Sequence, residues 1–159
     1  MKIKALALAA LAVFLVAVPL ALAAEQTKEG YVAEVEPICQ TNTKANEKIL
    51  GNVKAEVKAG RLAPAGASFL KAAAALKKTY TELGAVAQPT EYTAKLTKWL
   101  GYVKTEGTLF EKAGRLLKAG QKAKAQTVVN QLTQNANLAN FEVVSFGFRY
   151  CKFEPSKFV

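Results

Sequence analysis

The sequence predicts an all-α protein, an up-down-up-down four-helix bundle closed by one disulfide. Three observations support this fold class. Apolar residues recur at three- and four-residue steps through four long segments, which is the spacing of one stripe along an α-helix. Short links containing glycine or proline separate the segments, and short links favour antiparallel neighbours. The two cysteines, Cys39 and Cys151, lie near the two ends of the mature chain, which an up-down-up-down bundle brings to the same end.

The first 24 residues are expected to be a signal peptide rather than part of the bundle. A basic start precedes an apolar run, a proline and several small residues. This layout is typical of a secretory signal, and we expect cleavage after Ala23 or Ala24. An uncleaved membrane anchor is the alternative, because the uncharged stretch approaches the length that spans a bilayer. We therefore expect residues 25–159 to form one secreted or extracytoplasmic domain.

The first helix is expected over residues 27–59. Pro37 interrupts its apolar stripe, and either kinks the helix or opens its main part. The second helix is expected over residues 64–83. It contains four successive alanines, which favour helix and let a partner approach closely.

The third helix is expected over residues 92–117, where the apolar stripe is clearest. Gly107 and Gly114 fall on this stripe, and we expect a neighbouring helix to cross closely there; a groove for an apolar ligand is the alternative. The fourth helix is expected over residues 121–146. The aromatic tail, residues 146–159, alternates like an extended segment, and we expect it to form a lid on one end of the bundle rather than an exposed patch for a partner.

One structural disulfide is expected between Cys39 and Cys151. Small exported domains use such bridges, whereas a redox-active pair more often has the spacing C-x-x-C. In an up-down-up-down bundle, the start of the first helix and the end of the fourth lie at the same end. The bridge and the topology therefore support each other.

Composition narrows the functions that the chain can have. It has 22 basic residues, no histidine, and 12 acidic residues that are all glutamate. Without histidine or aspartate, the usual zinc, copper, haem and calcium sites are hard to build, so we expect no metal and no cofactor. We also expect no catalytic residue. Among the glutamates, Glu106 is the strongest candidate for an acid or base, because it falls near an apolar stripe where desolvation raises a pKa.

The positive charge favours a non-enzymatic binding or structural module at the cell envelope. The formal net charge is +10, or +8 without the two signal-peptide lysines, which suits anionic polymers; another exported protein is also a possible partner, and no specific nucleic acid is expected. We expect a monomer with no transmembrane segment after signal cleavage. The densest basic groups form a candidate anion-binding surface: Lys71, Lys77, Lys78, Arg115, Lys118, Lys122 and Lys124.

Two further features keep other functions open. The fourth helix is rich in amides, which both donate and accept hydrogen bonds, so Asn130, Gln134 and Asn137 are a candidate polar ligand face. The alternative function is a carrier that holds an apolar small molecule in the bundle core.

Several short motifs together resemble one group of proteins. They are Tyr31-Val32-Ala33, Ile38-Cys39, Lys98-Trp99-Leu100, Ala119-Gly120 and the stretch from Phe146 to Cys151. Their arrangement is similar to small exported helical proteins of unknown function from Gram-positive bacteria with high genomic GC, which usually carry one cysteine near each end. Those proteins often have Gly-Asp before the last helix, where this chain has Gly120-Gln121. The resemblance implies fold and export, and no catalytic residues.

Overall fold

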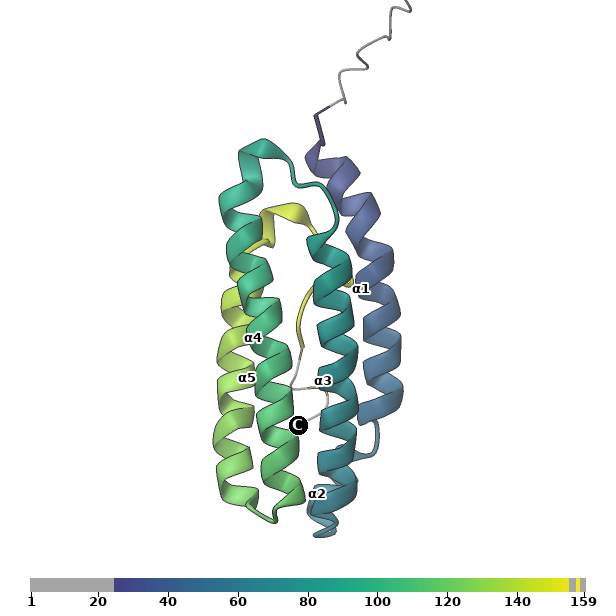
Figure 1. The fold of residues 1–159 in the computed structure, drawn as a ribbon, viewed down its shortest axis with the longest axis vertical. Coiled ribbons are helices and arrows are strands. Elements are labelled where there is room, and N and C mark those ends of the chain that lie inside the picture. The colour runs from purple at the N-terminus through teal and green to yellow at the C-terminus, as the bar shows by residue number, and fades with distance from the viewer. Residues whose placement is uncertain (1–24, 155–156, 158–159) are drawn as a thin grey trace, which may run out of the picture.

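The computed structural model describes residues 25–154 and 157, and the predicted signal peptide lies outside them. The elements in order are α1 (Lys28–Leu50), α2 (Val53–Lys58), α3 (Leu62–Gly84), η1 (Thr90–Tyr92), α4 (Thr93–Lys118), α5 (Lys122–Glu142) and η2 (Val144–Phe146). The four long helices α1, α3, α4 and α5 run alternately up and down (Figure 1). The predicted all-α four-helix bundle is confirmed. From residue 25 onward, no described helix has the length and apolarity needed to cross a bilayer.

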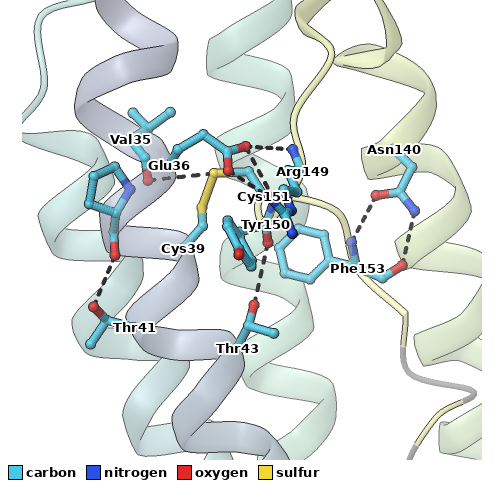
Figure 2. The surroundings of a disulfide bond; sticks show 11 residues. Val35, Glu36, Cys39, Thr41, Thr43, Asn140, Arg149, Tyr150, Cys151 and Phe153 are labelled. Atoms are coloured by element: carbon cyan, nitrogen blue, oxygen red, sulfur yellow. Dashed lines mark hydrogen bonds between the residues drawn. A yellow bond between two sulfur atoms is a disulfide. The ribbon is translucent and has the colours of Figure 1, made fainter.

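The helices pack in chain order, and the C-terminal segment completes the bundle. α3 packs closely on α4, α4 on α5, and α1 on α3, whereas α1 and α5 are not among the closely packed pairs. Residues 147–154, called the C-terminal segment below, hydrogen-bond to α1 on one side and α5 on the other (Figure 2). The segment therefore fills the place where the ring of four helices would otherwise close.

The expectation of one continuous first helix is wrong, because α1 and α2 are separate. α1 ends at Leu50 and α2 begins at Val53, with a turn at Gly51 and Asn52 between them. Glycine and asparagine are both weak helix formers, so the break falls where continuing the helix is least favourable. Leu50 and Val53 are both buried in the same core cluster, and the break lets α2 pack against α3.

Pro37 does not end α1, although the sequence suggested an interruption there. It lies inside the helix and is exposed, as is Ala33, whose carbonyl loses its normal donor at position 37. Because this side of the helix faces solvent, water can reach the carbonyl that the proline leaves unpaired.

The fourth helix is shorter than the predicted 121–146. α5 ends at Glu142, η2 follows, and Gly147 then adopts a left-handed conformation with φ of 66°. Only glycine reaches this region without steric cost, so Gly147 sets the point where the chain turns back. The fourth helix therefore gives way to the C-terminal segment earlier than its apolar periodicity indicated.

The aromatic residues around η2 cover one end of the bundle. Phe146 and Phe148 are buried, with the Phe148 ring 5.6 Å from Trp99 and the Phe146 ring 6.2 Å from Tyr31. After Gly147 the C-terminal segment runs back along the bundle (Figure 1). The tail is thus a lid at η2, as expected, and a wedge between two helices beyond it.

α3 and α4 cross with their backbones in contact. A Cβ atom placed on Gly114 would lie 2.8 Å from the carbonyl oxygen of Gly66, and one on Gly66 would lie 2.6 Å from that of Gly114. Both distances are shorter than real contacts, so no side chain fits at either position. The close crossing expected at Gly114 is present, whereas at Gly107 the nearest atom to a Cβ is 3.7 Å away, an ordinary contact.

Candidate functional site

A layer of buried polar residues divides the apolar core. One cluster of buried apolar residues lies toward α2 and includes Phe69 and Phe110; the other lies toward η2 and includes Tyr31 and Trp99. Each of the four long helices contributes one buried polar side chain between the two clusters: Asn46 from α1, Thr79 from α3, Glu106 from α4 and Asn135 from α5. We call these four residues the polar layer. Buried polar groups cost free energy unless they are paired, so their hydrogen bonds decide what the layer can do.

Glu106 is the only ionisable residue in the polar layer. Its residue surface is 1% exposed, and its Oε2 accepts a hydrogen bond of 2.6 Å from Asn135 Nδ2, which also donates to the carbonyl of Tyr102. Burial raises the pKa of the Glu106 carboxyl to about 7, and the hydrogen bond from Asn135 opposes this rise. The sequence singled out Glu106 because it lies near the apolar stripe, and the structure places it inside the core.

Asn46 carries an acceptor that the fold leaves unpaired. Its Nδ2 donates to Asn42 Oδ1 at 3.3 Å, but its Oδ1 is buried and accepts no hydrogen bond. Thr79 Oγ1 donates its proton to the carbonyl of Ala75, which leaves its lone pairs available as acceptors.

Asn46, Thr79 and Glu106 line one hollow in the bundle. The hollow has a volume of about 70 Å³, and Leu50, Leu76 and Phe110 supply much of its apolar wall. A space of this size holds a few water molecules and is much smaller than the pockets of roughly 300–1,000 Å³ that bind drug-sized ligands. This hollow is therefore too small for a drug-sized apolar ligand, and the carrier of an apolar molecule stays a prediction.

The C-terminal segment forms the outer wall of the hollow, and three polar side chains hold it there. Glu36 on α1 accepts hydrogen bonds from the backbone N–H groups of Arg149 and Tyr150, and Thr43 donates to the carbonyl of Tyr150 (Figure 2). On the other side, Asn140 of α5 accepts from the N–H and donates to the carbonyl of Phe153, both at 2.9 Å. The segment is therefore tied to both neighbouring helices through its backbone.

The predicted Cys39–Cys151 disulfide is present and lies beside the hollow. Its Cα atoms are 5.0 Å apart, and both cysteines line the hollow. Cys39 lies near the middle of α1 rather than near its start, and Cys151 reaches it because the C-terminal segment turns back from the end of the bundle. The bridge thus fixes the segment at mid-height instead of joining two helix ends.

The net charge is concentrated in one half of the molecule. The polar layer separates residues 47–78 and 107–134, called the basic half, from the rest of the described chain. The basic half has twelve lysines and arginines against three glutamates, whereas the other half has eight basic and nine acidic residues. All of the excess positive charge therefore lies between the polar layer and the α2 end.

All seven residues of the predicted anion-binding surface lie in the basic half and are exposed. Two of them have acidic partners, because Lys78 pairs with Glu82 and Arg115 pairs with Glu111. Lys71, Lys77 and Lys78 lie on α3, and the other four lie at the end of α4 and the start of α5. The basic surface thus extends over several helices around one end of the bundle.

The predicted amide face lies on the surface, and the amides with structural roles are different residues. Asn130, Gln134 and Asn137 are exposed on α5. Asn135 and Asn140, on the same helix, bond to Glu106 and to the C-terminal segment. The sequence did not distinguish these two groups. Asn135 lies four residues before buried Ala139, and Asn140 lies four residues after buried Ala136, so both lie on the inner side of the helix.

One exposed apolar group was also missed. Leu138, Phe141 and Val144 are 52%, 75% and 73% exposed near the end of α5. In the part of the chain that the structure describes, no three histidine, cysteine, aspartate or glutamate side chains gather where they could hold a metal ion. No model of a protein family, no curated protein and no solved structure matches this chain, so the resemblance to small exported helical proteins stays a prediction.

Proposed function

We propose that the protein is an extracytoplasmic, non-enzymatic binding module whose basic half binds anionic polymers of the cell envelope. The observation that supports the proposal is the uneven charge: twelve basic and three acidic residues in the basic half, and eight basic and nine acidic residues in the rest of the described chain. A concentrated positive field attracts polyanions and raises their local concentration. The disulfide and the predicted signal peptide fit a location outside the cytoplasm.

The shape of the bundle suits this role. The basic half ends in α2 and the short links between α2 and α3 and between α4 and α5, where Lys58, Arg61, Lys118 and Lys122 are exposed. Exposed charges from several helices at one end of the bundle can contact several sites along a flexible polymer. Binding of this kind depends on charge and weakens as salt screens it.

The test compares two variants with the same change in net charge at different places. Lys122→Glu/Lys124→Glu removes charge from the basic half, and Lys95→Glu/Lys104→Glu removes it from the other half; all four lysines are exposed. Affinity for long-chain polyphosphate is measured by fluorescence anisotropy between low and high salt. We expect steep salt dependence for the wild type and about tenfold weaker binding for the first variant only. Equal weakening by both variants, or affinity independent of salt, contradicts the proposal.

A further inference from the structure

The polar layer has more hydrogen-bond acceptors than the fold uses. Three of its side chains line the same hollow: the Glu106 carboxyl, Asn46 with its unpaired Oδ1, and Thr79, whose only proton is donated to Ala75. These acceptors come from α4, α1 and α3, so the hollow is surrounded by acceptors on three sides. A buried acceptor without a donor costs about 1–3 kcal/mol, which favours a guest that brings donors.

The buried carboxyl also lacks a compensating charge. The partner that the structure gives Glu106 is the neutral amide of Asn135, and desolvation dominates its environment. The charged side chains that line the hollow are Glu47 from α1 and Lys152, Glu154 and Lys157 near the chain end, and Lys157 pairs with Glu154. The hollow's lining residues from α3 and α4 include no charged group besides Glu106. With Glu106 ionised, the lining has three carboxylates against two lysines, so a guest with one positive charge would balance it.

We propose that the hollow binds the protonated amino group of a short-chain primary amine. An –NH₃⁺ group has three N–H donors and no acceptor, which matches the three acceptors of Glu106, Asn46 and Thr79. Leu50, Leu76 and Phe110 provide an apolar wall for a short alkyl chain.

The size of the hollow limits the length of this ligand. One water needs about 10–15 Å³ of such space, so a hollow of about 70 Å³ has room for roughly five heavy atoms. The C-terminal segment lines the hollow and is held by Glu36, Asn140 and the disulfide, so one wall of the site is fixed in place.

The experiment is calorimetric titration of the purified, oxidised protein at pH 8. n-Butylammonium chloride is the probe, and tetramethylammonium chloride, which has the charge but no N–H donor, is its control. We expect saturable one-to-one binding of butylammonium only. Glu106→Gln should weaken binding at least about tenfold, because it removes the charge. Glu91→Gln, which removes an exposed carboxylate that does not line the hollow, should change affinity less than about twofold.

Two further measurements separate a ligand site from a layer that only specifies helix packing. Thr79→Val keeps the side-chain shape and removes one acceptor, and should weaken binding several-fold while the circular dichroism spectrum is unchanged. Because a proton competes with the amine for Glu106, affinity should fall about tenfold for each pH unit below the carboxyl pKa.

The proposal is overturned if butylammonium gives no binding heat with a folded protein, which would leave a hollow that holds only water. It is also overturned if tetramethylammonium binds equally well or if Glu106→Gln binds unchanged. None of these results depends on the polyphosphate assay, because the basic half and the hollow are different sites.

Discussion

Replacing Glu106 by glutamine should stabilise the protein at neutral and alkaline pH. The residue is 1% exposed, and burial raises its pKa from 4.5 to about 7. Between these two pH values the folded state keeps the proton and the unfolded state loses it, so stability falls as pH rises. The difference between the two pKa values corresponds to about 3 kcal/mol in the free energy of unfolding, since one pKa unit is worth about 1.4 kcal/mol. The loss of stability from ionising Glu106 is complete above pH 7 and absent below pH 4.5.

Glutamine has nearly the same shape, stays neutral, and keeps a carbonyl oxygen that can accept from Asn135 Nδ2. Urea unfolding of both proteins with the disulfide intact, from pH 4 to pH 8 at fixed ionic strength, measures the effect. The free energies of unfolding should agree near pH 4 and differ by about 3 kcal/mol at pH 8, with the variant more stable. Glu47→Gln is the control, because Glu47 is exposed. Parallel curves for wild type and Glu106→Gln would refute the reasoning.

Three other perturbations test the packing. Reducing the disulfide, which closes a loop of 112 residues, should lower the free energy of urea unfolding by up to about 4.7 kcal/mol. It should also increase hydrogen exchange in the C-terminal segment. Unchanged exchange there would mean that the segment's hydrogen bonds hold it in place without the bridge. Gly114→Ala should destabilise the protein by about 1–3 kcal/mol, because its Cβ would meet the backbone of α3. Gly101→Ala, with open space around it, should stabilise the protein by up to about 1 kcal/mol. Thermal unfolding that ranks the two variants the other way contradicts the close crossing. Asn140→Ala should cost about 1–3 kcal/mol and Asn137→Ala almost nothing in the same assay, unless the amide pairing with Phe153 is dispensable.

Helical periodicity predicted the bundle well because each long helix buries one continuous stripe. Tyr31 and Val35 on α1, and Leu96, Trp99 and Val103 on α4, are buried at the predicted spacing. The disulfide could also be predicted, because only one pairing exists for two cysteines. These features depend on local sequence and on a small number of possible partners.

The features that periodicity missed depend on where the chain meets distant segments. Pro37 looked like a break, but its unpaired carbonyl faces solvent and the helix continues. The real break follows Leu50, where α2 gains packing against α3. In the sequence, Asn46 and Asn135 could not be told apart from the exposed amides near them. Asn135 is distinguished by its hydrogen bond to Glu106 of α4, and Asn46 by lining the hollow, and both depend on residues of other helices. A buried polar layer is formed by residues from four helices, so no single window of sequence displays it.

The place of the C-terminal segment determines the order in which the fold can be completed. Cys151 follows all four long helices in the chain, so every helix has been synthesised before the bridge can form. The close pairs α1–α3, α3–α4 and α4–α5 join helices that are consecutive or nearly so, and such local contacts form quickly. We therefore expect the helices to pack before the C-terminal segment takes its place between α1 and α5. Oxidation of the two thiols then secures a bundle that local contacts have already assembled.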